Sequence, residues 1–408
     1  MSKKVIWLIN QYVTRYSDSG GTRHLDFASE WVKKGYEVHI FASGFHYNEH
    51  QEKILNKDEF YKIEKINEIT VHWIKIVPYV KNNYKRFISM YSFYRNVLNY
   101  ISKKNKYIST PDIVIGSSVH LLAVLAAYKI SKRYNSKFIV EIRDLWPETL
   151  VQLGKISKQH IVYKFFHFLE KFLYKKADYI VTLLDRAHEY ISKYTVCKIE
   201  CIPNGFNHRR LEDVRCNTYK NECDNFTVLY LGTIGLADDV KTLLETAKLL
   251  KEYKNISIKI IGDGVERNKL IKFKNKNKLN NVLFENPIPK NLVLEELSKV
   301  DVVWVGMPNS EKLYKYGLSS NKIYDYMIMR KPVIISTPLK ENIITCSKCG
   351  LSIPAENSQQ LFNSIVQFYQ MDKAQLEEYG DAGHDYIMKY FTIEKLNKKW
   401  IKIFNELL

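Results

Sequence analysis

The chain lacks any apolar run that approaches the ~18 residues of a membrane-spanning helix. Its N-terminus has too short an apolar part for a signal peptide and no small-residue cleavage pattern. Both absences predict a protein that folds in water, as do the 46% hydrophobic and 26% charged residues. With 408 residues, the chain is too long for one ordinary core, and at least two domains are expected.

Cysteine is sparse, and all six thiols lie at or beyond residue 197. Only Cys346 and Cys349 stand at a spacing typical of metal or redox sites, and no second pair or histidine completes a zinc site. We therefore expect structural thiols, a reducing cytoplasm and no metal centre. The other cysteines are Cys197, Cys201, Cys216 and Cys223.

Two familiar nucleotide signatures are also missing. No G-x-G-x-x-G follows the first apolar run, which disfavours a dinucleotide oxidoreductase. No nucleic-acid recognition motif accompanies the net charge of +18, so nucleic acid is not an expected partner.

What the chain does have is a regular alternation of short apolar runs with helical patterns, such as 22–34 and 121–133. Such alternation predicts parallel sheets covered by helices on both faces. We predict an α/β fold of two doubly wound, Rossmann-like domains, at residues 1–195 and 196–390. A final helix at 391–408 should pack back toward the first domain, and the polar stretch 209–225 belongs to the hinge. The runs are 5–9, 38–41, 71–77, 113–116, 138–142, 179–184, 227–231, 256–261, 282–284, 302–305 and 333–336.

Polar and glycine-rich loops follow these runs, where a doubly wound sheet binds its ligands. Glycines at a helix start let backbone N–H groups approach an anion, and glycine after a strand lets the backbone run close to a nucleotide. Polar side chains after 113–116 and 138–142 should converge in one cleft. The candidate residues in these loops are Gly20, Gly21, His120, Arg143, Asp144, Glu148, Gly232, Thr233, Ile234, Gly235, Gly262, Gly264 and Arg267.

The most informative segment begins at Ser320 and Asn321, just before the apolar run at 333–336. Lys322 and Asp325 stand three residues apart at the start of a predicted helix, so they should face the same way. The ammonium could then meet a diphosphate while the carboxylate accepts hydrogen bonds from ribose hydroxyls. This arrangement predicts a site for a nucleotide sugar.

In their order and spacing, these motifs resemble those of the family 4 glycosyltransferases, enzymes of the GT-B fold, over nearly the whole chain. Residues 143–148 and 232–237 look most like the WbuB-like N-acetyl-fucosaminyltransferases of bacterial surface-polysaccharide (O-antigen or capsule) assembly. The resemblance implies retaining transfer of an N-acetylhexosamine or 6-deoxy sugar from a UDP-sugar to a lipid-linked glycan. It also implies that His120 orients a donor-sugar hydroxyl, and Asp144 or Glu148 an acceptor hydroxyl.

The chain departs from the family pattern around the expected phosphate site. Where many relatives carry an Arg and, a few residues on, a Lys, this chain has Thr233 and the acidic pair Asp238 and Asp239. Gly317 stands where a Glu is usual. No Asp-x-Asp follows a strand, so no Mg²⁺ or Mn²⁺ and no other cofactor is expected. Charge on the diphosphate would be neutralised by Lys322, by backbone N–H groups at 232–235, and by Arg143 or Arg267.

Two alternatives stay open. An enzyme like UDP-GlcNAc 2-epimerase shares the architecture and would turn over its substrate without an acceptor. A non-catalytic, nucleotide-sugar-binding partner subunit would account for the missing Arg and Lys.

The positive charge is concentrated in the first 200 residues, which contain 32 Lys and Arg but only 19 Asp and Glu. Residues 81–107 contain no acid, and aromatic residues such as Phe87 and Tyr91 recur there at helical spacing. This pattern is typical of a helix at an anionic membrane surface, here the inner face of the cell membrane. A core-facing helix with a solvated lysine rim is the alternative, and 164–176 is a second such stretch. The proposed membrane cations are Lys81, Lys85, Arg86, Lys103, Lys104 and Lys106.

Overall fold

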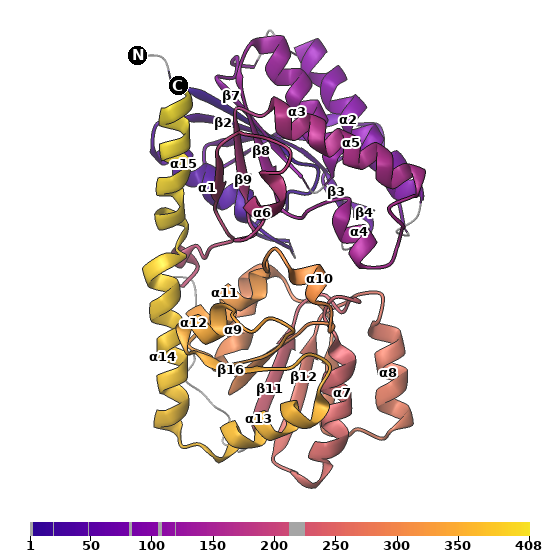
Figure 1. Ribbon diagram of the computed structural model, residues 1–408, viewed down its shortest axis with the longest axis vertical. Coiled ribbons are helices and arrows are strands. Elements are labelled where there is room, and N and C mark those ends of the chain that lie inside the picture. Colours follow the sequence, from indigo (N-terminus) through magenta and orange to yellow (C-terminus); the bar gives the residue numbers. More distant parts are fainter. Residues whose placement is uncertain are drawn as a thin grey trace.

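The computed structural model describes residues 3–18, 20–47, 49–80, 84–104, 108–118, 120–211 and 225–408, apart from the side chain of Lys104. Over these ranges the chain forms two α/β domains, one above the other in the view of Figure 1. The predicted fold class, two Rossmann-like domains with parallel sheets, is confirmed. Lys81, Lys106, Cys216, Cys223 and most of the stretch 209–225 lie outside the described residues.

The first domain is built on an eight-stranded sheet with the order β10-β9-β8-β7-β1-β2-β6-β5. Its central strands are largely apolar because helices cover both faces, and every residue of β1 is buried. The strands are β1 (Val5–Ile9), β2 (Glu37–Ser43), β5 (Tyr61–Ile66), β6 (Ile69–Ile74), β7 (Ile113–Ser117), β8 (Lys137–Ile142), β9 (Tyr179–Thr182) and β10 (Ile199–Cys201). A separate hairpin pairs β3 (Phe45–His46) with β4 (Gln51–Glu52).

Two details of this sheet were not predicted. Strand β5 runs antiparallel to β6 at one edge, and its alternation of exposed polar residues hides it from a search for apolar runs. Strand β10 pairs with β9 at the other edge. The first domain therefore extends beyond the predicted boundary at residue 195.

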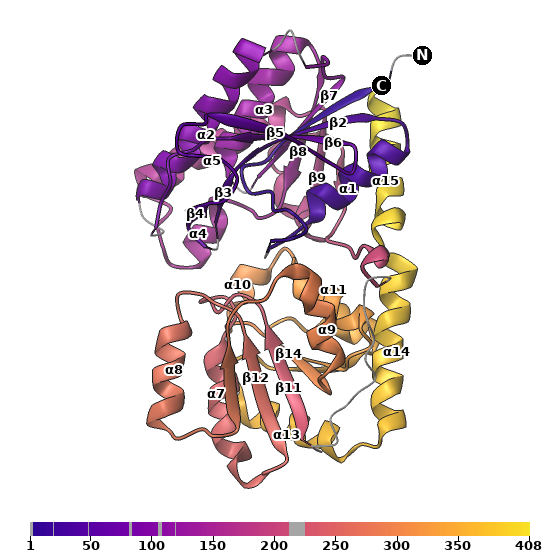
Figure 2. The same ribbon diagram turned by 180° about the vertical axis from the view of Figure 1, so that it is seen from behind.

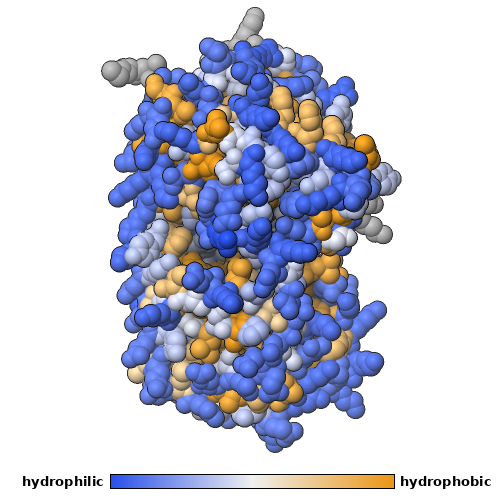
Figure 3. Space-filling model, in the orientation of Figure 1, coloured by the Kyte–Doolittle hydropathy of each residue, from blue (hydrophilic) through white to orange (hydrophobic). Residues whose placement is uncertain are grey.

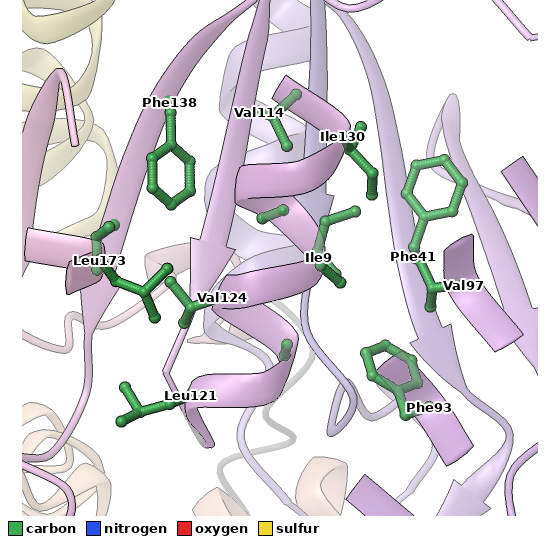
Figure 4. Packing of buried hydrophobic residues seen from close by; sticks show 14 of the residues in the cluster. Ile9, Phe41, Phe93, Val97, Val114, Leu121, Val124, Ile130, Phe138 and Leu173 are labelled. Carbon is green, nitrogen blue, oxygen red and sulfur yellow. The ribbon is translucent and has the colours of Figure 1, made fainter. Parts of the chain in front are cut away.

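Helices of the first domain lie on both faces of the sheet (Figures 1 and 2). They are α1 (Arg23–Lys33), α2 (Tyr84–Lys104), α3 (Leu121–Tyr134), α4 (Glu148–Gln152), α5 (Ile161–Lys176) and α6 (His188–Ile191). Figure 4 shows how α3 packs across the sheet between α2 and α5. The core there contains Ile9, Phe41, Phe93, Val97, Val114, Leu121, Val124, Ile130, Phe138 and Leu173.

The second domain has a six-stranded parallel sheet with the order β13-β12-β11-β14-β15-β16. Its strands are β11 (Phe226–Leu231), β12 (Ile256–Ile261), β13 (Val282–Glu285), β14 (Val302–Gly306), β15 (Val333–Ser336) and β16 (Gly350–Ile353). Its helices are α7 (Val240–Leu249), α8 (Arg267–Lys276), α9 (Val293–Ser298), α10 (Glu311–Tyr314), α11 (Asn321–Ile328), α12 (Ile343–Ser347), α13 (Ser358–Gln370) and α14 (Lys373–Tyr390). The 3-10 turns are η2 (His208–Leu211), η3 (Leu250–Glu252) and η4 (Lys290–Leu292).

The last helix, α15 (Ile393–Leu407), returns to the first domain. Figures 1 and 2 show α14 beside the second domain and α15 beside the first. The Trp400 ring packs on the Trp31 ring of α1, with the centroids 5.3 Å apart. The chain thus crosses between the domains twice, once through η2 and once between α14 and α15.

Candidate functional site

A cleft of about 330 Å³ lies between the two domains. The carboxyl ends of parallel strands from both sheets point toward it, which is where doubly wound folds bind their ligands. Residues of both domains line it, among them Asp144, Leu184, Asp238, Gly317, Ser320 and Lys322.

Lys322 carries the most informative contacts in this cleft. Its Nζ donates to the Tyr230 hydroxyl at 2.9 Å and to Asp238 Oδ1 at 2.7 Å. The ammonium lies beside Gly232, where a Cβ would stand 3.1 Å from it and where φ is +154°. Glycine is favoured at that position because of its positive φ, and a Cβ there would crowd the lysine ammonium. Burial, and then Asp238, raise the pKa of Tyr230 well above its ordinary value, so its hydroxyl stays neutral.

Three backbone N–H groups of the loop at 232–235 already have acceptors in the protein. Gly232 donates to the Ile261 carbonyl at 3.0 Å, and Ile234 to the Asp263 carbonyl at 2.8 Å. Gly235 donates to Asp238 Oδ2 at 3.3 Å. These N–H groups were expected to be available to a diphosphate, and in this structure they are not.

Gly262 and Gly264 serve the packing of that loop. Both have φ near +150°, and a Cβ on either would overlap the backbone carbonyl of Gly232 or Ile234. The two loops therefore lie backbone to backbone. Thr233 is exposed, and its carbonyl accepts from the Tyr230 hydroxyl.

Asp325 does not share a contact with Lys322. Its carboxylate is only 4% exposed and pairs with Arg210, at 2.8 Å, and with Lys290. Burial alone would raise the pKa of Asp325, but Lys290 and Arg210 hold it below its ordinary value. We expected this carboxylate to face a ribose beside Lys322. In the structure it pairs instead with two cations of the protein itself.

In the first domain, a buried ionic cluster fixes the glycine loop that precedes α1. Glu141 accepts from Arg23 Nε at 3.0 Å, from His24 Nε2 at 2.6 Å and from Ser117 Oγ at 2.7 Å. Burial opposes the charge of Glu141, but Arg23 and His24 hold its pKa well below the ordinary value. The guanidinium of Arg23 also donates to the Ile202 and Pro203 carbonyls of the linker.

The glycine loop itself touches the second domain. A Cβ at Gly21 would lie 3.1 Å from Asn321 Nδ2, at the start of α11. Gly20, with φ of +144°, packs on Thr14. Gly21 of the first domain thus lies against Asn321 of the second domain. Asn321 directly follows Ser320, which lines the cleft.

His120 caps α3 and is fully buried. Its Nδ1 accepts from the Ala123 N–H at 3.2 Å, so Nε2 carries the proton and donates to Gln11 Oε1 at 2.7 Å. Burial, assisted by the Arg86 guanidinium, lowers the pKa of His120 to about 3. The imidazole is therefore neutral, and both of its nitrogens are already bonded.

The segment after β8 separates its three candidate residues. Asp144 is exposed and lines the cleft. Arg143 is half-buried, and its backbone N–H donates to Ser118 Oγ. Glu148 pairs with Lys158 at 2.8 Å and accepts from the Tyr163 hydroxyl, so its carboxylate is already occupied.

Arg267 lies farther along the second sheet. One guanidinium nitrogen donates to Asn286 Oδ1 at 3.2 Å, just beyond β13. Because β13 is two strands from β11, the structure does not bring Arg267 into the contacts of Lys322.

Sequence reasoning missed a contact between the domains at Gly317. Asp185 follows β9, and its carboxylate lies where a Cβ on Gly317 would stand, with φ at +113°. The Arg186 N–H donates to the Tyr316 carbonyl at 3.1 Å. The departure from the family pattern at Gly317 was the available signal, but the partner in the other domain was not visible.

Helices α2 and α5 present a joint apolar surface. Phe87 of α2 packs against Phe166 of α5, with the ring centroids 5.8 Å apart. The side chains of Phe165 and Phe168 on α5 are 56% and 70% exposed. Figure 3 shows apolar side chains among polar ones at the right of the upper domain. We call these exposed residues the α2–α5 surface: Tyr84, Phe87, Ile88, Tyr91, Ile161, Phe165 and Phe168.

The cations assigned to a membrane surface differ in position. Lys85 and Lys103 are exposed, whereas Arg86 is half-buried and its charge acts on His120. Lys104 ends α2. None of the described helices is long and apolar enough to cross a membrane.

Comparison with known proteins agrees with this architecture. Residues 19–210 match the model named Glycosyltransferase Family 4, and residues 225–371 match Glycosyl transferases group 1. Both models describe glycosyltransferase domains, one for each half of the chain. An uncharacterized glycosyltransferase of Methanocaldococcus jannaschii is 26% identical over 219 residues, 49% of this chain and 52% of that protein. The chain thus spans about half the length of this relative.

Solved structures share the fold of this chain over nearly all of its length. Sucrose-phosphate synthase from Thermosynechococcus elongatus is 16% identical, with a TM-score of 0.75 and 99% of each chain covered. Anabaena HepE, in complex with UDP-glucose, is 12% identical, with a TM-score of 0.67, 99% of this chain and 100% of that chain covered. At these identities the likeness extends to the GT-B fold only.

Proposed function

We propose that this protein is a retaining, metal-independent glycosyltransferase that moves a sugar from a UDP-sugar to a lipid-linked glycan in bacterial surface-polysaccharide biosynthesis. The donor sugar we propose is an N-acetylhexosamine or its 6-deoxy derivative, as the resemblance to the WbuB-like group implies. That HepE, a protein of the same fold, binds UDP-glucose supports a UDP-sugar donor.

The observation that supports this function best is the position of the Lys322 ammonium, beside Gly232 at the end of β11 and on the cleft between the domains. A cation there can stabilise a leaving diphosphate without a metal ion. Asp144 lines the same cleft from the first domain and would orient the acceptor hydroxyl. In a retaining transfer, the departing phosphate oxygen would take the proton of that hydroxyl.

A thermal-shift screen of UDP-, GDP- and dTDP-sugars in excess EDTA tests the donor, because a ligand that binds the native state raises its melting temperature. We expect stabilisation by UDP-sugars. Lys322→Ala should lose about 2 kcal/mol of donor binding, because a charge-assisted contact is removed. Stabilisation that requires Mg²⁺ or Mn²⁺, or an unchanged affinity in Lys322→Ala, would contradict the proposal. Turnover of UDP-GlcNAc without an acceptor would instead indicate an epimerase.

We also propose that the α2–α5 surface attaches the protein to an anionic membrane, on the inner face of the cell membrane, where a lipid-linked acceptor would lie. Exposed aromatic side chains can enter the interface between headgroups and acyl chains. The neighbouring exposed lysines, Lys85 on α2 and Lys164 on α5, add attraction to anionic lipids.

A further inference from the structure

We propose that the Asp238 carboxylate occupies the phosphate-binding position of the free protein, and that the donor's phosphate replaces it on binding. Asp238 is then an internal competitor that sets how strongly an anion is held. This inference rests on the proposed function only for the identity of the anion, a phosphate of the donor.

Asp238 already has the contacts that an anion would need. One carboxylate oxygen lies 2.7 Å from Lys322 Nζ, and the other accepts from the Gly235 N–H at 3.3 Å. An ammonium and a backbone N–H at the end of a strand are the donors that usually bind phosphate oxygens. The carboxylate thus serves as the anion of this site.

The charge balance makes simultaneous occupation unfavourable. The side chains of Lys322 and Asp238 are only 16% and 20% exposed, and together they carry no net charge. A diphosphate beside an intact pair would meet a like charge in a partly desolvated cleft, where repulsion is strong. The ammonium becomes available to phosphate only when Asp238 leaves it.

Asp238 can leave without disturbing the sheet. It belongs to the turn between β11 and α7, where Leu236 and Ala237 are exposed. The neighbouring contacts of the loop, Gly232 with Ile261 and Ile234 with Asp263, involve backbone atoms on the far side of Gly235. Rotation of the Asp238 side chain would therefore release Lys322 while the backbone of the loop stays in place.

Asp238→Asn is the direct test, because it removes the charge and keeps the shape. The probe is inorganic pyrophosphate, titrated by calorimetry into the full chain with EDTA at pH 8. We expect Asp238→Asn to bind pyrophosphate about tenfold more tightly than the wild type, because Lys322 loses its competing charged partner. The gain should disappear in Asp238→Asn/Lys322→Ala.

Asp239→Asn is the matched control, because it removes an adjacent charge that does not contact Lys322. Burial raises the pKa of Asp239 to about 6, so this carboxyl is ionised at pH 8. A similar gain in this variant would show a general charge effect and overturn the inference. Pyrophosphate binding by Asp238→Asn and Asp238→Ala equal to that of the wild type would also overturn the inference. Weaker or undetectable binding by both variants would overturn it too, and would make Asp238 the residue that positions Lys322.

The same variants distinguish this inference from the proposed function. If UDP-sugars bind none of them while pyrophosphate shows the tenfold gain, the donor assignment fails and the exchange at Lys322 stands. If UDP-sugars bind the wild type, Asp238→Asn and Asp239→Asn alike and pyrophosphate shows no gain, the donor assignment stands and the exchange fails.

Discussion

The guanidinium of Arg210 donates to the Asp325 carboxylate at 2.8 Å and so joins the linker between the domains to α11. Lys290 binds the other carboxylate oxygen. Because Asp325 is almost fully buried, its negative charge depends on both cations. The carboxylate that the motif assigns to a ribose is therefore also a structural group of the hinge.

Asp325→Asn should lower the free energy of unfolding by about 3 kcal/mol, because it leaves two buried cations without their anion. Chemical denaturation measures this loss. The control is Asp381→Asn, whose partner Arg330 and own side chain are about half exposed, so that it should cost less than ~1 kcal/mol. Equal losses in the two variants would contradict the structural role of Asp325.

The fold could be predicted from the sequence more fully than the site, and the reason is physical. Strands such as β1 and β7 are buried on both faces, so their residues are apolar and visible in sequence. Edge strands β5 and β10 lack that constraint and were missed. Spacing located Lys322, but its partner Asp238 lies 84 positions away, and no local pattern encodes such a pair. Asp185 at Gly317 even comes from the other domain.

Two buried histidines predict how stability depends on pH. Burial lowers the pKa of His72 and of His120 to about 3, from 6.5. Below pH 6.5 a proton therefore binds the unfolded chain more readily than the folded one. The free energy of unfolding should fall as pH decreases from 6.5 toward 3, by roughly 1 kcal/mol per pH unit for each histidine.

Denaturation curves at pH 7.5, 5.5 and 4.5 check this dependence. His120→Gln should show a shallower decrease than the wild type, because one of the buried histidines with a lowered pKa, which also include His24 and His39, no longer titrates. His188→Gln, at an exposed position, should keep the wild-type slope. If the free energy of unfolding of His120→Gln fell with pH as steeply as that of the wild type, His120 would be protonated in the folded protein.

The α2–α5 surface makes a separate prediction about membranes. Phe165→Ser/Phe168→Ser should weaken binding to anionic vesicles, because two exposed aromatic side chains are lost from the interface. Lys85→Gln/Lys164→Gln should weaken it further by roughly 1 kcal/mol per charge, and high salt should act similarly. Vesicle flotation measures both effects.

UDP-sugar affinity should stay unchanged in all these membrane variants, since the donor contacts lie in the second domain. If the variants and the wild type float equally, the α2–α5 surface does not bind membranes, and α2 and α5 are core-facing helices with a solvated lysine rim.

Asp144 and Glu148 stand four residues apart, but the structure separates their roles. Asp144 lines the cleft, whereas Glu148 is held by Lys158 and Tyr163. If Asp144 orients the acceptor hydroxyl, Asp144→Asn should lower kcat by about 100-fold, because the reacting hydroxyl is no longer held in position, at unchanged UDP-sugar affinity. Glu148→Gln should instead lower the melting temperature and leave kcat within about threefold, since by this geometry it contributes to no proton transfer. Steady-state kinetics beside thermal unfolding separates the two effects, and a larger kcat loss in Glu148→Gln would exchange the assignments.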